Sequence, residues 1–101
     1  MEIKQAQQKT DELIKQYGGY WEPLSMYARL VEEVGELGRS MNIKFGGKKS
    51  KNKDDGKETG EELADVMFTT LAIANKLNIN LDIEFQNKLE KDFIKCKEVY
   101  K

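Results

Sequence analysis

Hydrophobic residues recur with the period of an α-helix in four stretches of the chain. They predict helices at residues 2–17, about 24–45, about 58–77 and about 81–100. The period is clearest in the second stretch, where one stripe holds Tyr27, Leu30, Val31, Val34, Leu37, Met41 and Phe45. Because strand signals are few, we expect an all-α fold, a four-helix bundle.

Glycine, proline and asparagine mark the breaks between these stretches. Gly18-Gly19 ends the first helix, Pro23 suits a first helical turn, and Asn80 is a plausible cap for the last helix. Gly46-Gly47 stops the second helix, and residues 48–57, KKSKNKDDGK, contain no apolar side chain. We therefore expect a mobile lysine-rich loop at about 46–57, inserted in a single domain that spans residues 1–101.

The third helix is apolar on nearly every side after Asp65, from Val66 through Leu77. A helix that is apolar all round must be covered all round. Three companion helices can hardly cover it within so short a chain. We therefore expect it to pack within the chain and also against another subunit.

The charge balance restricts the class of partner. Seventeen Lys and Arg face 18 Asp and Glu, for a formal net charge of −1. A dedicated nucleic-acid binder normally carries a basic surplus, so no nucleic-acid polymer is expected as a partner. No apolar run is long enough for a membrane span and the polar N-terminus does not look like a signal peptide. With Cys96 as the only cysteine, these features favour a cytoplasmic protein.

The absence of histidine narrows the chemistry further. The sequence contains no His, which excludes His-ligated zinc, a histidine general base and a Ser-His-Asp triad. A single cysteine likewise excludes a cysteine-cluster metal site. Any metal ligands must then be carboxylates and water, which suit Mg²⁺, Mn²⁺ or Ca²⁺.

Two acidic motifs offer such ligands. The second helix carries Glu33 and Glu36, and the third helix carries Glu62 and Asp65. In each pair the two residues are three positions apart, so they lie one turn apart on one helix face. Two such helices side by side would present four carboxylates to one cation. Acidic pairs at this spacing are common by chance in an acid-rich chain. The alternative is a solvated acidic face with intrahelical pairs such as Arg29 with Glu33.

The two motifs together resemble a known family. LVEEVGELGR followed by EELADVMFTTLAIANKL is similar to the MazG-like, all-α nucleoside triphosphate pyrophosphohydrolases, whose signature is EExxE, a spacer, and ExxD. The resemblance extends from about Tyr20 into the last helix. It implies a homodimer or homotetramer. It also implies hydrolysis of a (deoxy)nucleoside triphosphate to the monophosphate and pyrophosphate, with Mg²⁺, or alternatively Mn²⁺, as cofactor.

The resemblance also implies roles for individual residues. It makes metal ligands of Glu33, Glu36, Glu62 and Asp65 and gives a catalytic role to Glu32 and Glu33, with Glu32 activating water or binding a further ion. It implies substrate contacts for Trp21, Lys88 and Lys95, and from its place on the second helix Arg39 is a further candidate for a phosphate contact. For two of these another interpretation stays open, because Trp21 could belong to a packing cluster and Arg39 could pair with Glu36. Asp92 stands where the family commonly has Asn.

A nucleotide-pool, house-cleaning hydrolase is therefore the first hypothesis. Two rivals remain: a non-catalytic helical oligomer that serves as an interaction or regulatory module, and a phosphoribosyl-ATP pyrophosphohydrolase, which shares the helical architecture. The first rival predicts no Mg²⁺-dependent turnover. The second rival is less favoured, because phosphoribosyl-ATP pyrophosphohydrolases carry other residues around the second acidic motif than the ADVMFTTLAIAN of this chain.

Overall fold

The computed structural model describes residues 1–47 and 58–99, and these residues form four α-helices. The helices are α1 (Ile3–Gln16), α2 (Pro23–Phe45), α3 (Thr59–Lys76) and α4 (Leu81–Val99). Their bounds lie within about two residues of the ranges that the hydrophobic period predicts, and the all-α class is confirmed. The predicted lysine-rich loop falls almost entirely on residues 48–57, which lie outside the described residues.

The predicted helix ends are confirmed by the backbone. Gly18 and Gly19 follow α1 with φ of 114° and 88°, values that favour glycine over any residue with a side chain. The Gly19 amide donates to the carbonyl of Ile14 at 2.8 Å, which closes the end of α1. Pro23 stands at the first position of α2, and the side chain of Asn80 accepts a hydrogen bond from the Ile83 amide at 3.3 Å at the start of α4.

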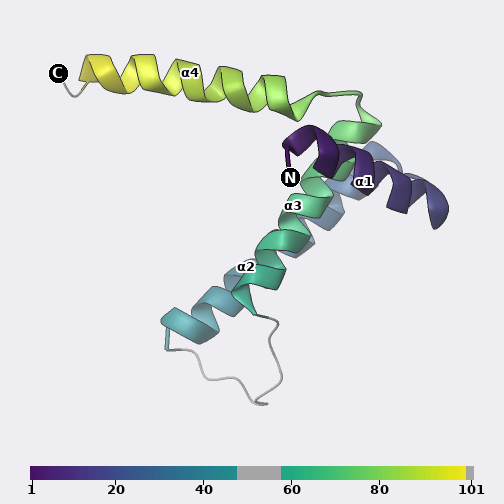
Figure 1. Cartoon of the computed structure of the whole chain (residues 1–101). Helices are drawn as coiled ribbons and strands as arrows, with labels where there is room; N and C mark the ends of the chain where they lie inside the picture. Colours follow the sequence, from purple (N-terminus) through teal and green to yellow (C-terminus); the bar gives the residue numbers. More distant parts are fainter. Residues whose placement is uncertain (48–57, 100–101) are drawn as a thin grey trace.

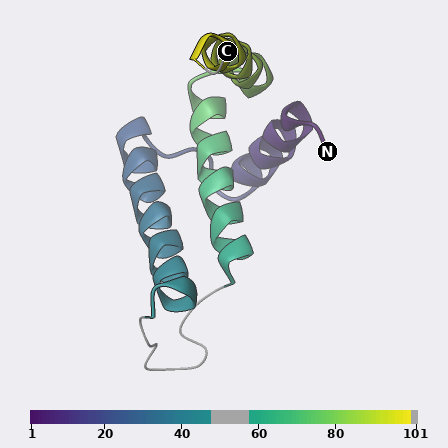
Figure 2. The same cartoon turned by 90° about the vertical axis from the view of Figure 1, so that its left-hand side faces the viewer.

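Helix α3 is the centre of the arrangement. It packs along α2 over the largest helix–helix contact of the described chain, and α1 packs on α3 as well. Figure 2 shows α3 between α2 on one side and α1 on the other. Four apolar residues are buried among the described residues: Met26, Leu71, Ala72 and Ala74. Three of the four belong to α3, so the small core follows this helix.

Helix α4 is arranged differently from the other three. It projects sideways from the end of α3 in Figure 1 and packs on α1 through a small contact near its own start. A hydrogen bond from the Lys4 amide to Asp82 Oδ2, 3.0 Å long, joins α1 to the first turn of α4. No residue of the described part of α4 is buried. Within one chain, the bundle is therefore three packed helices and one extended helix.

Candidate active site

Three carboxylates from two helices meet where α2 packs on α3. Glu33 of α2 and Glu62 and Asp65 of α3 each offer one oxygen, and these oxygens all lie within 4.8 Å of one another. Glu33 is 8% exposed and Glu62 is 3% exposed, whereas Asp65 is half-buried. Carboxylates are rarely buried together without a compensating cation, so this group is a candidate metal centre.

Local structure fixes the position of these side chains. Glu62 lies in the first turn of α3, where the positive end of the helix dipole favours an acidic residue. The hydroxyls of Ser40 and Thr59 lie 3.1 Å apart and hold the second half of α2 against the start of α3. Thr69 Oγ1 donates to the carbonyl of Asp65 at 3.0 Å, one turn further along α3. The Ser40–Thr59 contact therefore fixes α2 against α3 near the group, while the Thr69 bond lies within α3.

The donor set fits a hard divalent cation. Mg²⁺ binds oxygen ligands at about 2.0–2.1 Å, so ligands on opposite sides of it lie roughly 4 Å apart. A small contraction of the 4.8 Å group would meet that requirement. Carboxylate oxygens are the ligands that Mg²⁺ and Mn²⁺ prefer. The chain also has no His, and Cys96 lies on α4.

A hollow of about 490 Å³ opens beside the carboxylates. Residues of α1, of the α1–α2 junction, of α2 and of α3 line it, and none of the lining residues comes from α4. Its lining includes the aromatic side chains of Tyr17, Tyr20, Trp21 and Phe68. The charged residues of the lining are Arg29, Glu33 and Asp65. A hollow that combines aromatic side chains with carboxylates suits a ligand that has both a flat ring and a metal-bound anion.

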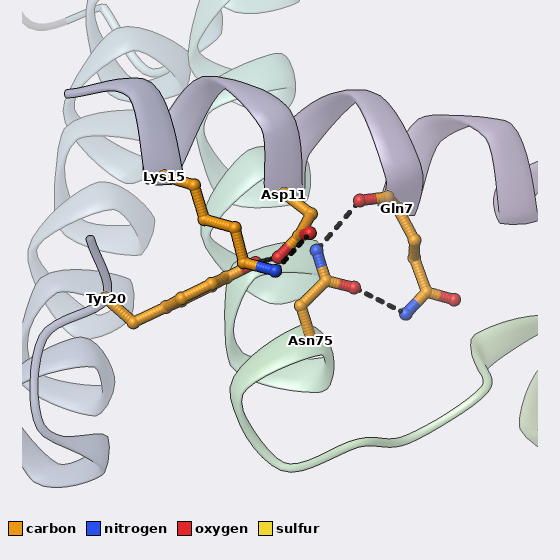
Figure 3. A network of polar contacts seen from close by, with 5 residues as sticks. All are labelled: Gln7, Asp11, Lys15, Tyr20 and Asn75. Atoms are coloured by element: carbon orange, nitrogen blue, oxygen red, sulfur yellow. Dashed lines mark hydrogen bonds and ion pairs between the residues drawn. The ribbon is translucent and has the colours of Figure 1, made fainter. Parts of the chain in front are cut away.

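A polar network fixes the wall that α1 provides, as Figure 3 shows. The Tyr20 hydroxyl donates to Asp11 Oδ1 at 2.5 Å, and Lys15 Nζ pairs with Asp11 Oδ2 at 3.0 Å. The hydrogen bond from Tyr20, and after it that from Lys15, lowers the pKa of Asp11. Burial, reinforced by the hydrogen bond to Asp11, raises the pKa of Tyr20 to about 12. Tyr20 therefore stays a neutral donor, and its bond to Asp11 attaches the chain next to Trp21 to α1.

The same network connects α1 to the end of α3. Gln7 Nε2 donates to Asn75 Oδ1 and to the Ile79 carbonyl, both at 2.9 Å, and Asn75 Nδ2 donates to the Gln7 carbonyl at 2.8 Å. Gln7 Oε1 also accepts from the Leu81 amide at 3.0 Å. The sequence interpretation missed Gln7, Asp11 and Asn75. The spacing of Gln7 and Asp11, four residues apart on one face of α1, is the signal that was available.

The predicted site residues do not all come together. Glu33, Glu62 and Asp65 do, and Trp21 lines the hollow beside them. Glu32 and Glu36 lie on α2 but are exposed and outside the group of three, and the half-buried Arg39 does not line the hollow. The intrahelical pair of Arg29 with Glu33 is present at 2.9 Å, so it exists together with the acidic group and does not replace it.

The two lysines predicted to contact substrate, Lys88 and Lys95, lie on α4 and are exposed. Lys88 Nζ pairs with Asp92 Oδ2 of its own helix at 2.7 Å. Since no residue of α4 lines the hollow, these lysines would have to approach the hollow of another copy of the chain.

The comparison with known proteins decides the family. The model of the MazG nucleotide pyrophosphohydrolase domain matches residues 21–100. The chain belongs to the MazG family. The match covers α2, α3 and α4, so it includes both acidic motifs and the extended helix. Membership supports pyrophosphohydrolase activity, the cleavage of phosphoric anhydride bonds, on nucleotides.

Individual relatives agree with this assignment. An uncharacterized protein of Bacillus subtilis (strain 168), YpjD, is 43% identical over 81 residues, which are 79% of this chain and 73% of YpjD. The crystal structure of YpjD has a TM-score of 0.80 at 39% identity, covering 90% of this chain and 94% of that one. A Bacillus-conserved MazG protein, a nucleotide pyrophosphohydrolase, gives 0.76 at 38% identity, covering 90% and 88%. The MazG-like fold is therefore confirmed.

No helix among residues 1–47 and 58–99 has both the length and the apolar character needed to cross a membrane.

Proposed function

We propose that this MazG-family chain hydrolyses (deoxy)nucleoside triphosphates to a nucleoside monophosphate and pyrophosphate, as a nucleotide-pool hydrolase. One observation carries the proposal: three carboxylates from α2 and α3 lie together, and two of them, Glu33 and Asp65, line a hollow that aromatic side chains also line. An acidic site would repel a triphosphate unless a cation lies between them. The geometry therefore favours a substrate that arrives with a divalent cation.

The cation site consists of Glu33, Glu62 and Asp65, with Glu36 as a further predicted ligand. When bound, Mg²⁺ or Mn²⁺ supplies neutralisation of the phosphate charge and a water of lowered pKa. Glu33 and Glu62 come from different helices and are nearly buried, so packing fixes their direction before any ligand arrives. Glu32 is the further predicted catalytic residue, either as proton acceptor for the attacking water or as ligand of a further ion. It is exposed and adjoins Glu33 in sequence.

The aromatic wall is the proposed place for the base. Trp21 and Tyr17 line the hollow and are both exposed, so a ring can reach their faces. The hydrogen bond from Tyr20 to Asp11 restrains the backbone at Tyr20, directly before Trp21. In this proposal the base contacts the aromatic side chains and the phosphates face the carboxylates.

Water attacks the α-phosphorus directly in this proposal. The lining of the hollow includes no Ser, Cys or Lys, its Thr69 hydroxyl donates to the Asp65 carbonyl, and its carboxylates Glu33 and Asp65 are the proposed cation ligands, so we expect no covalent phosphoryl intermediate. Attack at the α-phosphorus breaks its bond to the bridging oxygen and releases pyrophosphate. The new oxygen then stays on the monophosphate.

Hydrolysis in ¹⁸O-labelled water tests the reaction. A panel of common and oxidised triphosphates is screened for Mg²⁺-dependent pyrophosphate release, and the products are analysed by mass. We expect label in the monophosphate only. Label found only in pyrophosphate would place attack at the β-phosphorus. No Mg²⁺-dependent release from any triphosphate would contradict the proposed function and favour a non-catalytic helical module.

Assembly is the remaining part of the proposal. Many large apolar side chains of α2, α3 and α4 are exposed in the single chain, among them Val34, Met67 and Phe93. Exposed apolar area of this kind is typical of subunit interfaces. We propose a homodimer or homotetramer, in which α3 and α4 contact another copy.

A further inference from the structure

Arg29 occupies an unusual place beside the carboxylate group. It lies on α2 one turn before Glu33, and its Nε atom is 2.9 Å from Glu33 Oε1. Its Nη1 atom is 3.5 Å from Glu32 Oε2. Arg29 also lines the hollow and is the one basic residue among the described residues that do so. The candidate metal ligand Glu33 is therefore already paired with a cation of the chain itself.

The two partners in this ion pair differ in freedom to move. The side chain of Glu33 is 10% exposed, whereas that of Arg29 is 53% exposed. Packing between α2 and α3 holds the glutamate, but the long arginine side chain borders the open hollow. If the pair must separate, Arg29 is the partner that moves.

A divalent cation on the carboxylate group would favour such a separation. Its two positive charges would lie next to the guanidinium, and like charges at this range repel. The carboxylate of Glu33 would then turn from the guanidinium to the stronger cation. A displaced guanidinium inside the hollow has a natural partner in a phosphate oxygen, because its planar donors match phosphate geometry.

We propose that Arg29 is an exchangeable counter-ion of the carboxylate group. It pairs with Glu33 while no divalent cation is bound, and turns into the hollow toward the phosphate chain of the nucleotide when one is. The first half concerns the protein and a divalent cation alone. The second half rests on the proposed function, because it requires a nucleotide with a phosphate chain in the hollow.

The first half is tested by titrating Mg²⁺ into the full chain without nucleotide, with heat of binding as the readout. Removing a positive charge next to the site should tighten Mg²⁺ binding in Arg29→Gln by at least about threefold. Arg29→Lys keeps the charge and should stay close to the unmodified chain. Lys9→Gln is the matched control, since it removes the same charge from an exposed position on α1 that does not line the hollow.

Unchanged or weaker Mg²⁺ binding in Arg29→Gln would overturn the exchange. Weaker binding would instead make Arg29 a partner that orients Glu33 as a ligand. A second readout distinguishes a change in Mg²⁺ affinity from a folding defect. The rise in melting temperature caused by Mg²⁺ should be larger in Arg29→Gln than in Lys9→Gln, and both variants should retain the helical signal in circular dichroism.

The second half is tested with a non-hydrolysable nucleoside triphosphate and Mg²⁺. Trp21 is the single tryptophan of the chain and lines the hollow, so its fluorescence reports binding. We expect Arg29→Gln to weaken triphosphate binding roughly tenfold while it tightens Mg²⁺ binding, and a purely structural defect would weaken both. Triphosphate binding as tight as in the unmodified chain would overturn the second half. If the unmodified chain hydrolyses no nucleotide, the proposed function fails, whereas the Mg²⁺ titration still decides the first half.

Discussion

Helices α2, α3 and α4 have 23, 18 and 19 residues, but α2 and α3 pack along each other whereas α4 has no buried residue within one chain. Among residues 1–47 and 58–99, the pair forms the largest contact between helices, contains all four buried apolar residues and holds the three carboxylates. Helix α4 has a small contact with α1 and no buried residue, and Phe93 in its middle is 73% exposed. Both regions lie in the part of the chain that matches the MazG family.

The two regions therefore differ in role: the α2–α3 pair holds the carboxylate group, whereas α4 has an apolar surface that the described chain does not cover. The carboxylates need only two helices held in register, which one chain supplies. The apolar residues of α4 need a surface to cover them, which the described part of one chain does not supply. We infer that the carboxylate group forms within one chain and that the hydrophobic core is completed between chains.

Neutralising a buried carboxylate should have the largest effect. Glu62→Gln should lower Mg²⁺-dependent pyrophosphate release by more than about 100-fold and abolish the Mg²⁺-induced rise in melting temperature, because a cation ligand is lost. Helicity should be retained, since neutralisation also relieves repulsion within the group. Glu61→Gln is the control: Glu61 is the exposed neighbour in the same turn of α3. Equal activity in the two variants would exclude Glu62 as a ligand.

Placing a charge in the proposed subunit contacts should have the next largest effect. Phe93→Asp on α4 should shift the chain to a smaller species in sedimentation at micromolar concentration and leave most helicity, because α4 contributes no buried residue within one chain. Ile73→Asp on the half-buried face of α3 should dissociate and unfold the protein together, since an unpaired buried charge is costly.

Asn87→Asp is the control for this comparison, because it adds the same charge at an exposed position of α4. It should leave the assembly unchanged. A monomeric unmodified chain at micromolar concentration would contradict the assembly proposal. Equal loss of helicity in Phe93→Asp and Ile73→Asp would contradict the distinction between the two helices.

The bond from Tyr20 to Asp11 should give the smallest effect. Tyr20→Phe should lower the free energy of unfolding by about 1 kcal/mol at neutral pH, the usual size for one hydrogen bond. The pKa of Tyr20 is raised from 10.0 to about 12 in the folded chain, so its contribution is complete below pH 10 and is lost as pH rises toward 12. The pKa of Asp11 is lowered, so its contribution is present above about pH 4 and is lost as pH falls through the lowered value.

Unfolding free energies measured across this pH range check the prediction. The difference between the unmodified chain and Tyr20→Phe should shrink at both ends of the range. Tyr27→Phe, which removes a hydroxyl from an exposed position of α2, should show no such difference. A difference that is constant with pH would mean that the Tyr20–Asp11 bond does not stabilise the folded chain.

The sequence by itself determined the helices, their ends and the family. Apolar periodicity, the Gly18-Gly19 stop, Pro23 and Asn80 act over a few residues, so they can be interpreted without knowing the rest of the fold. The two acidic motifs carried the resemblance to the MazG family, and they named the three carboxylates that the structure brings together.

Only the tertiary structure decided which acids meet and what borders them. Spacing along a helix places Glu33 and Glu36 one turn apart but does not say which of them faces α3, and the structure brings Glu33 to Glu62 and leaves Glu36 exposed. It also showed that both partners of the Arg29–Glu33 ion pair line the hollow, and that the Tyr20 hydroxyl donates to Asp11. These contacts depend on the rotation and crossing of packed helices, which long-range packing sets and local sequence patterns do not encode.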